Sequence, residues 1–579
     1  MITITGHDIY SYIISGAKKL ILHEKYLNRI NVFPVADGDT GSNMAFTMKS
    51  IIRNSVKSIS VEDTLKSISR SAMASSYGNS GTIVAGYFNG LTMSLANREQ
   101  ISEYEFVQGL SDSVDYAYQS ISIPKEGTIL TVMRAWGNYL TQNYPLKQNL
   151  KDLFEESIWH AHTVMNDSKS LLKELREADV VDAGAKGFVY FIEGIYEFLK
   201  NGTVDETAIT EVLPTVIMPE HKEIGYRYCT EFILEPDEKY AKVLIENYLL
   251  SQGDSVIISD MSDYIKIHIH TDNPESSALF LREYGRIVDT KVDDMNIQYQ
   301  IANHRKHAIG IITDSIADIP KSVLLDNQIT VIPIQMIIDG RTYIDRVTLT
   351  SDNTYELIAE SKVYPTSSQP SDQYIEKTIE YLTQHYDYVL GIFVSSKMSG
   401  TFDKVKRIVE QSHYDQVKII DSKMNSGAQG LLVQAACKAI EAGQPFSQVY
   451  DTVVEKIDKI KLYVQIPDLS YATKSGRVPK VVGKVASLFK LKVIISIDED
   501  GEGIVTKERS IAKKVKKYLT NGKIKQYGIV HSSNLDKAQK LADHMAEIIG
   551  ETPVFIENVS AVVAAFIGKD AVGIVYEEV

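Results

Sequence analysis

The sequence predicts three consecutive domains: an all-helical domain, a small α/β domain and a larger α/β domain with a parallel sheet. From residue 7 to about 200, apolar residues recur at spacings of three and four, as they do in amphipathic helices. Short β-rich runs follow, and from about residue 307 strand-like runs alternate with helical ones, which is typical of parallel sheets. We therefore expect domains at residues 1–202, 203–306 and 307–579.

Composition and charge narrow the classes of protein that fit. The 579 residues are too many for one hydrophobic core, and 61 Lys and Arg against 75 Asp and Glu give a net charge of −14, which disfavours nonspecific nucleic-acid binding. Cys229 and Cys437 offer no disulfide framework, and the first residues lack the basic-then-apolar design of a signal peptide. The longest apolar runs are about half the roughly 20 residues that cross a bilayer. We expect a cytoplasmic protein without a transmembrane segment or a nucleic-acid partner.

Four glycine-containing loops in the helical domain each stand before an apolar helical stretch: "DGDTGSN", "SYGNSGTIVAG", "KEGTILTV" and "DAGAKG". Unpaired N–H groups at helix starts attract phosphate, so the four loops are candidates to converge on one ligand. Asp37 and Asp39 alternate along the first loop and can present carboxylates to magnesium. Taken alone, such a pair of aspartates is more often an ordinary solvated turn with a helix cap.

These loops, as "FPVADGDTGSNM", "GNSGTI", "EGTILTV" and "VVDAGAKG", resemble the nucleotide-binding subunit of dihydroxyacetone kinase and, more closely, the N-terminal domain of bacterial fatty acid kinase. The resemblance implies an eight-helix barrel that binds ATP through two magnesium ions. It implies Asp37 and Asp39 as catalytic metal ligands, with Asn31 at the position of a further acidic ligand. The phosphate and nucleotide contacts that it implies are Asn43, Asn79, Ser80, Thr128, Asp182 and Gly184.

The middle domain contains a candidate zinc site. In "YIKIHIHTDNPE", His268 and His270 lie on one face of a predicted strand, and Cys229 lies in another strand-like run. One thiolate and two imidazoles suit zinc, whereas a lone H-x-H pair is more often packed or solvent-facing. The segment also resembles the central domain of fatty acid kinase, which implies a zinc site with these residue types.

The last domain carries "IGIITDSIADIP", "YPTSSQPS", "VSSKMSGTF", "VKIIDSKMNSGAQG" and "ATKSGRV", which together resemble the DegV family of fatty-acid-binding proteins over residues 308–579. Hydroxyls at strand ends can hold a carboxylate while an apolar tunnel buries the acyl chain, at about 0.8 kcal/mol per methylene. The residues implied for the substrate are Thr366, Ser367, Ser399, Gly400 and Thr401.

Two positions near this site concern catalysis. Arg477 resembles the family's arginine at the mouth of the site, where a cation helps to neutralise phosphate, although a lone loop arginine is more often a surface charge. Phe566 stands where the family often has a histidine, which leaves a histidine contribution to phosphoryl transfer in doubt.

The sequence thus predicts a fused fatty acid kinase that converts a bound fatty acid into an acyl phosphate with ATP and two Mg²⁺, and with Zn²⁺ in the middle domain. Its expected partners are fatty acid and the acyl-phosphate-using enzymes of phospholipid synthesis, and a homodimer is left open. One alternative is a kinase or phosphotransferase for a small polyol or ketone. The other is a fatty-acid-binding carrier or regulator whose nucleotide domain senses ATP without turnover.

Overall fold

The structure is a computed structural model that describes residues 3–33, 38–76, 78–121, 124–147, 149–203, 225–261, 264–467, 469–475, 493–506, 510–520 and 522–579. Two of the predicted site residues, Asp37 and Arg477, lie outside these ranges. The chain divides into two compact units. The first consists of Met1–Cys229, Gly253–Ser262 and Lys266–His270, and the second of Thr230–Gln252, Asp263–Ile265 and Thr271–Val579. Within the described ranges, no helix has the length and apolar character needed to cross a membrane.

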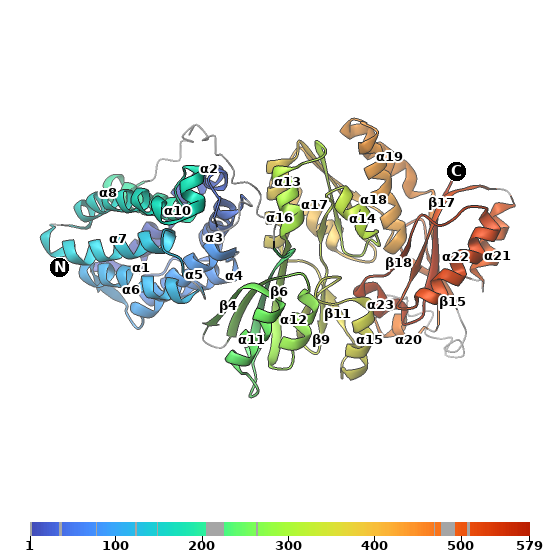
Figure 1. The fold of residues 1–579 in the computed structure, drawn as a ribbon, viewed down its shortest axis with the longest axis horizontal. Helices are drawn as coiled ribbons and strands as arrows, with labels where there is room; N and C mark the ends of the chain where they lie inside the picture. Colours follow the sequence, from blue (N-terminus) through green and yellow to red (C-terminus); the bar gives the residue numbers. More distant parts are fainter. Residues whose placement is uncertain are drawn as a thin grey trace. The chain divides into compact units, whose positions relative to one another are not determined.

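The N-terminal region is helical, as predicted, and is coloured blue to teal in Figure 1. Its helices are α1 (Gly6–Leu22), α2 (Glu24–Arg29), α3 (Thr40–Asn54), α4 (Val61–Ala74), α5 (Gly78–Ser94), α6 (Glu103–Gln119), α7 (Ile129–Asn143), α8 (Leu150–Ser168), α9 (Lys173–Ala178) and α10 (Ala183–Asn201). Two 3₁₀ turns, η1 (Tyr144–Leu146) and η2 (Lys169–Leu171), and an antiparallel pair, β1 (Thr3–Thr5) with β2 (Gln100–Ser102), complete it. Eight of the α-helices described here are 14 to 19 residues long, which agrees with the eight helices that the resemblance implies.

Local sequence signals explain where these helices begin, and one core holds them together. Ser102 and Glu105 form a capping box at the start of α6, which satisfies N–H groups that a helix start leaves unpaired. Trp136 is fully buried in the core, and its indole N–H donates to Ser157 Oγ at 2.9 Å. That bond removes the cost of burying an unpaired donor and fixes α7 against α8.

The middle region contains the predicted short strands and helix. Its elements are β3 (Tyr228–Pro236), α11 (Lys242–Gln252), β4 (Gly253–Met261), β5 (Tyr264–Thr271), α12 (Pro274–Leu281), β6 (Gly285–Asp294) and α13 (Met295–Asn303). The strands form a four-stranded sheet in the order β4-β5-β3-β6.

The first part of the C-terminal region has a parallel sheet in the order β13-β12-β7-β8, as the strand-then-helix alternation predicts. A small antiparallel sheet, β10-β9-β11, lies beside it in sequence. The elements are β7 (Ile309–Asp314), α14 (Lys321–Asp326), β8 (Thr330–Ile332), β9 (Gln335–Ile338), β10 (Arg341–Ile344), α15 (Ser351–Glu360), β11 (Thr366–Ser368), α16 (Asp372–His385), β12 (Tyr388–Phe393), α17 (Thr401–Gln411), β13 (Val417–Asp421), α18 (Ser426–Glu441) and α19 (Phe446–Ile457).

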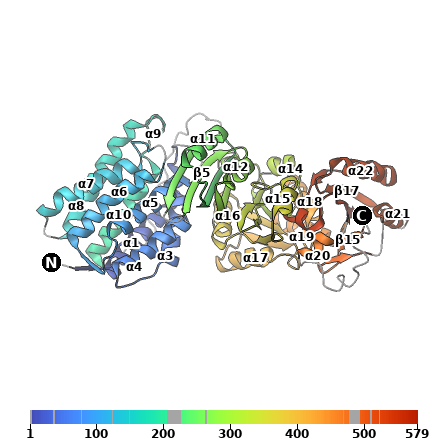
Figure 2. The same ribbon diagram turned by 90° about the horizontal axis from the view of Figure 1, so that it is seen from below.

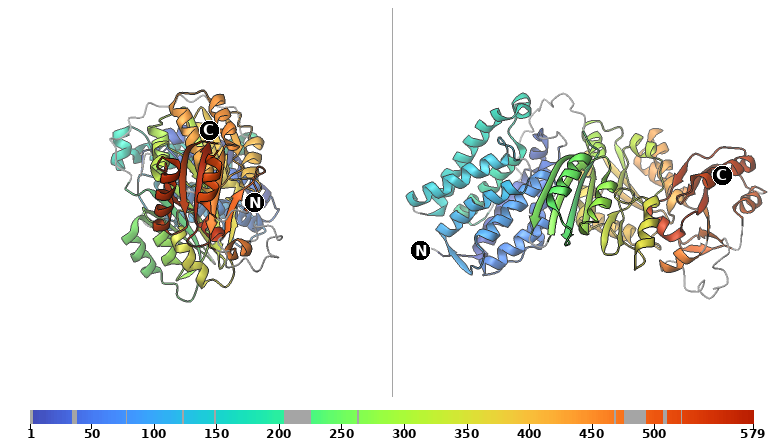
Figure 3. Two further views of the ribbon diagram at one scale, coloured as in Figure 1. Left: turned by 90° about the vertical axis from the view of Figure 1, so that its right-hand side faces the viewer. Right: turned by 60° about the horizontal axis from the view of Figure 1, so that its bottom comes forward.

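The second part departs from the predicted parallel sheet. Its six strands, in the order β16-β15-β14-β19-β17-β18, lie side by side in Figure 3 and pair antiparallel except for β17 with β18. The five-residue connection between β15 and β16 is too short for the crossover that parallel neighbours need. The elements are β14 (Ile460–Ile466), α20 (Ser470–Lys474), β15 (Val493–Ile497), β16 (Gly503–Val505), α21 (Ile511–Leu519), β17 (Ile524–His531), α22 (Leu535–Ile549), β18 (Ile556–Asn558), α23 (Ala561–Ile567) and β19 (Val572–Glu578).

Helix α18 joins the two sheets of the C-terminal region. On one side, Gln429 Nε2 donates to Thr313 Oγ1 of β7 at 3.1 Å. On the other side, Gly427 lies against Val530 and Val575 of the six-stranded sheet, where a Cβ atom would come within 2.8 Å of Val530. Helices α21 and α22 cover the opposite face of that sheet, as Figure 2 shows, and share its core. The region is therefore an α/β domain, and the predicted order of fold classes along the chain is confirmed.

Candidate functional site

The first predicted loop leads into α3 and positions Asp39 and Asn43. Asp39 occupies the cap position before Thr40, and the Asn43 side chain donates to Asp39 Oδ2 at 2.7 Å. Asn43 is only 2% exposed, and its Oδ1 has no hydrogen-bond partner among the described residues. Asn31 is also buried and accepts a hydrogen bond from Thr40 Oγ1 at 3.0 Å. A buried amide oxygen without a partner beside a carboxylate is the kind of donor that Mg²⁺ or its bound water takes up.

The second loop closes on the first through a glycine. Gly78 has a φ of +58°, and a Cβ atom at this position would lie 2.8 Å from Asn43 Nδ2. The backbone of the second loop therefore passes directly against the Asn43 side chain, an approach that only glycine allows. Asn79 and Ser80 follow in the first turn of α5, and Asn79 Oδ1 likewise has no partner within the described residues.

The third and fourth loops are tied together by Asp182. Its Oδ2 atom accepts from the backbone N–H of Ala185, which caps α10, and from that of Ile129, the first residue of α7, at 2.8 and 2.9 Å. Burial raises the pKa of this carboxyl group to about 6, against the opposing effect of the backbone donors. Thr128 caps α7 by position, and its hydroxyl donates to Lys125 O at 2.7 Å. Gly184 lies in the first turn of α10 against Asp182.

Packing between α3 and α10 connects these two pairs of loops. A Cβ atom at Gly187 of α10 would lie 2.8 Å from the Met44 sulfur of α3, and one at Gly41 of α3 would lie 2.8 Å from Leu27 of α2. Consecutive contacts therefore link the starts of α3, α5, α7 and α10. The structure brings together Asn31, Asp39, Asn43, Asn79 and the capping pair of α7 and α10.

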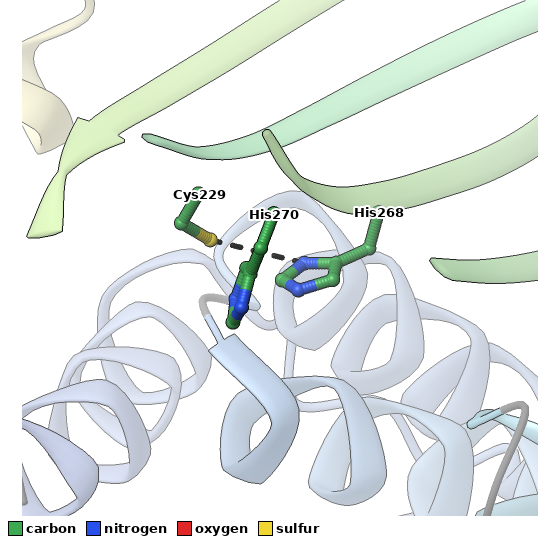
Figure 4. A group of neighbouring side chains, drawn as sticks. All are labelled: Cys229, His268 and His270. Carbon is green, nitrogen blue, oxygen red and sulfur yellow. Dashed lines mark hydrogen bonds between the residues drawn. The ribbon is translucent and has the colours of Figure 1, made fainter. Parts of the chain in front are cut away.

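The zinc candidates also come together, although they are up to 39 positions apart in sequence. Figure 4 shows the side chains of Cys229, His268 and His270 pointing toward one another. Their candidate ligand atoms all lie within 4.8 Å of one another, and Cys229 Sγ is 3.9 Å from His268 Nδ1. A tetrahedral zinc site has ligand atoms about 3.5 Å apart, so a small contraction would complete it.

Electrostatics around this cluster favour neutral imidazoles. Burial, together with the neighbouring His268, lowers the pKa of His270 to about 3. The Nδ1 atom of His270 lies 3.4 Å from Asp254 Oδ1, an arrangement like the carboxylates that orient metal-bound histidines. The donor types, their separations and the neutral His270 ring all fit a zinc site.

Lys266 is a site residue that the sequence did not single out. It occupies the same face of β5 as His268 and His270, since alternate residues share a face. It is 5% exposed, and its Nζ atom donates to Ser76 Oγ at 2.8 Å, next to the second glycine loop. The alternation K-x-H-x-H was the available signal, but nothing in it indicates a contact 190 positions away.

The predicted carboxylate site of the C-terminal domain is formed from two segments. Ser399 Oγ and Thr401 Oγ1 lie 2.9 Å apart at the start of α17, and Thr401 is fully buried. The Gln369 side chain, which follows the strand β11 that carries Thr366 and Ser367, lies against Gly400, where a Cβ atom would meet its Nε2 at 2.2 Å. This contact places the two hydroxyl segments beside each other.

An apolar pocket begins next to these hydroxyls at Met398, the residue before Ser399. Asn425 and Ser426 are its polar members at the start of α18. The rest of its lining consists of Leu462, Val464, Ile495, Ser496, Ile497, Gly503, Ile504, Val505, Val563 and Ile567. A predominantly apolar hollow beside a group of hydroxyls suits a molecule with an apolar chain and a polar head.

Phe566, the residue in place of the family's histidine, lies in the last turn of α23 close to these hydroxyl segments. Its neighbour Ala565 accepts a hydrogen bond through its backbone oxygen from Tyr364, two residues before Thr366. A phenyl ring has no proton to exchange, so this position supplies no acid or base.

Three family models match the chain in sequence order. The model described as "DAK2 domain" matches residues 34–197, and a model for the "FakA-like" middle domain, which belongs to the fatty acid kinase type, matches residues 225–302. The model described as "Uncharacterised protein, DegV family" matches residues 308–579.

Curated relatives match about half of the chain. An uncharacterised protein from Staphylococcus saprophyticus is 30% identical over 321 residues, which cover 53% of this chain and 58% of that protein. Protein YloV from Bacillus subtilis is 29% identical over 353 residues, which cover 55% of this chain and 64% of that protein. This chain therefore spans less than two thirds of the length of these relatives.

Solved structures match the C-terminal part. A fatty-acid-binding DegV family protein from Streptococcus agalactiae is 28% identical, with a TM-score of 0.43, over 46% of this chain and 98% of that one. DegV, a fatty acid binding protein from Bacillus subtilis, is 24% identical, with a TM-score of 0.42, over 47% of this chain and 100% of that one. From the three family models, the chain joins a DAK2 domain, a fatty acid kinase-type middle domain and a DegV-family domain in one polypeptide.

Proposed function

We propose that the protein is a fatty acid kinase in a single chain, which transfers the γ-phosphoryl group of ATP to the carboxylate of a fatty acid. The observation that carries this proposal is the presence of a DAK2 domain, a fatty acid kinase-type middle domain and a DegV-family domain in one polypeptide. The first two are kinase-type domains, and the third contains the hydroxyl groups and apolar pocket that suit an acyl substrate.

Linked helix starts and a partnerless buried amide oxygen, among the described residues, support ATP binding in the helical domain. The starts of α3, α5, α7 and α10 offer backbone N–H groups and partial positive charge for phosphate oxygens. Asp39, with Asp37 beside it in sequence, would hold magnesium, and Asn43 Oδ1 would face the metal or its water. Bound magnesium would neutralise phosphate charge, while the helix starts and Asn43 position the nucleotide.

The chemistry balances without a general base. A carboxylate oxygen of the fatty acid attacks the γ-phosphorus, a new P–O bond forms, and the bond to the β,γ-bridging oxygen breaks with its electrons passing to ADP. The total charge of fatty acid carboxylate and ATP equals that of acyl phosphate and ADP, so no proton has to move. Phe566 in place of a histidine is compatible with this reaction, because no imidazole is needed to activate a carboxylate.

Ser399 and Thr401 would bind the substrate carboxylate through their hydroxyls, and the pocket that begins at Met398 would bury the acyl chain. Each methylene buried adds about 0.8 kcal/mol, so chain length strengthens binding far more than a single hydrogen bond does. Joining the domains in one chain keeps donor and acceptor at a high effective concentration. Cys229, His268 and His270 would hold zinc in the middle domain.

We further expect the protein to act in the cytoplasm, where acyl-phosphate-using enzymes of phospholipid synthesis would take up its product, and a homodimer is compatible with this function. The two cysteines, Cys229 and Cys437, are both free, as a reducing compartment requires.

The test is to incubate the purified chain with ATP, Mg²⁺ and oleate or palmitate, and to trap acyl phosphate as the hydroxamate with hydroxylamine. We expect hydroxamate from the wild type and less than about one hundredth of it from Asp39→Ala, since charge neutralisation supplies several kcal/mol in phosphoryl transfer. Asp115→Ala, which removes an exposed carboxylate on α6, serves as the matched control and should react like the wild type.

If the wild type yields no hydroxamate although it binds both ATP and fatty acid, the kinase proposal fails. That outcome would favour the alternative of a fatty-acid-binding carrier whose nucleotide domain senses ATP, which Phe566 specifically favours. Hydroxamate or phosphorylated product from a small polyol or ketone, and none from fatty acid, would instead favour the small-molecule kinase.

A further inference from the structure

A lysine of the middle domain reaches the second glycine loop of the helical domain. Lys266 lies in β5, within the same compact unit as helices α1–α10. Its Nζ atom donates to Ser76 Oγ at 2.8 Å, to Ser76 O at 3.3 Å and to Thr82 Oγ1 at 3.4 Å. Ser76 precedes the loop and Thr82 lies in α5 just after it, so one ammonium group clamps both ends of the turn that contains Gly78.

The clamp continues into the turn itself. Thr82 Oγ1 donates to Gly78 O at 2.8 Å, and Gly78 in turn packs against the side chain of Asn43. Thr47 Oγ1, on α3, contacts Ser75 O at 3.2 Å from the other side of the loop. Lys266 is therefore connected through Thr82 and Gly78 to Asn43, whose buried Oδ1 has no partner among the described residues.

The position and burial of Lys266 give this contact an electrostatic consequence. The side chain is 5% exposed, so its charge is poorly screened by water at the start of α5. A helix start already carries partial positive charge, and a cation placed there raises the attraction for phosphate further. A lysine whose sole task was to pack or to cap the loop would be replaceable by a neutral side chain of similar size.

We infer that Lys266 is a positioning residue of the nucleotide site, contributed by the middle domain, which holds the Gly78 turn in its phosphate-binding form and adds positive charge to it. The inference rests on the proposed ATP-dependent function and extends it. It gives the middle domain a direct part in binding the phosphate groups of ATP, besides any structural part that a zinc ion would have.

The test compares nucleotides that differ only in phosphate. Binding of ATP, ADP and adenosine to the full-length chain is measured by calorimetry for the wild type, Lys266→Met and Lys266→Arg. We expect Lys266→Met to weaken ATP and ADP about tenfold, equal to ~1.4 kcal/mol, and to leave adenosine unchanged. Lys266→Arg keeps the charge and should recover most of the ATP affinity.

Ser259→Ala is the matched control. Ser259, in β4 of the same sheet, donates through Oγ to Ser120 O at 3.1 Å, a second hydrogen bond between the sheet and the helices, away from the glycine loops. Its loss should leave all three affinities unchanged. Thermal unfolding of each variant establishes that it is folded before binding is compared.

Equal losses of ATP and adenosine affinity in Lys266→Met, or no loss at all, would overturn the inference. If the wild type binds ATP and Lys266→Met weakens it selectively, while the wild type makes no acyl phosphate, the kinase proposal fails and the inference stands. If the wild type binds no ATP, both fail together.

Discussion

Gly78 offers the sharpest test of the nucleotide site, because two separate constraints act on it. Its φ of +58° lies in the left-handed region, and a Cβ atom would come within 2.8 Å of Asn43 Nδ2. Gly78→Ala therefore adds a conformational cost of about 1 kcal/mol and a steric cost of about 1 to 3 kcal/mol from overpacking against Asn43. We expect the free energy of unfolding to fall by about 2 to 4 kcal/mol in total.

Gly202 separates the two costs. It ends α10 with a φ of +72°, and no atom lies within 4 Å of the position where its Cβ would be. Gly202→Ala should therefore lose only the conformational term of about 1 kcal/mol. Chemical denaturation of both variants gives the difference, which isolates the contact with Asn43.

The same pair reports on function. Displacing Asn43 moves the buried Oδ1 atom that faces the nucleotide site, so Gly78→Ala should weaken ATP binding at least tenfold, whereas Gly202→Ala should not change it. Equal destabilisation of the two variants, with ATP binding intact in both, would refute the assignment of this turn to the nucleotide site.

Three further predictions concern Asp182, the cysteines and Ser399. Because the folded pKa of Asp182, about 6, lies above its unfolded value, the native state holds the proton more tightly and this group's contribution to stability falls as the pH rises through 6. From about pH 5 to pH 7.5, Asp182→Asn should gain about 1.4 kcal/mol relative to wild type, and denaturation curves showing no such change would contradict this. Cys229→Ser should lose bound zinc in elemental analysis, while Cys437→Ser, in the buried helix α18, should retain it; equal zinc contents would rule out the cluster as the site. Ser399→Ala should weaken fatty acid binding about tenfold, from one lost hydrogen bond to a charged group, and Ser412→Ala at the exposed far end of α17 should not, so matching affinities would remove Ser399 from the site.

The local sequence was sufficient for the order of fold classes and for most of the elements. Capping residues and spacings of three and four are local properties, and they marked helices such as α6 and α10 correctly. The parallel first sheet of the C-terminal domain also followed from its strand-then-helix alternation. The second sheet did not, because a strand after a helix can join either edge of a sheet in either direction, and only packing around α18 selects among these.

Zinc-site prediction shows the same limit at the scale of single residues. Period-two alternation alone places His268 and His270 on one face, but the approach of Cys229, 39 positions away, depends on which strand pairs beside β5. Likewise, the two hydroxyl segments of the C-terminal domain were chosen by residue type, and it is the packing of Gln369 on Gly400 that places them together.

The sequence by itself determined the order of domains, the glycine-containing helix starts and the chemical types of the candidate ligands, since all of these depend on neighbours within a few residues. Only the tertiary structure decided that Asp182 bridges two helix starts, that Asn43 Oδ1 is buried without a partner among the described residues, and that Lys266 reaches Ser76. The physical reason is that burial and hydrogen bonding between segments 53 and 190 positions apart are set by how whole elements pack, and no local pattern of residues encodes that packing.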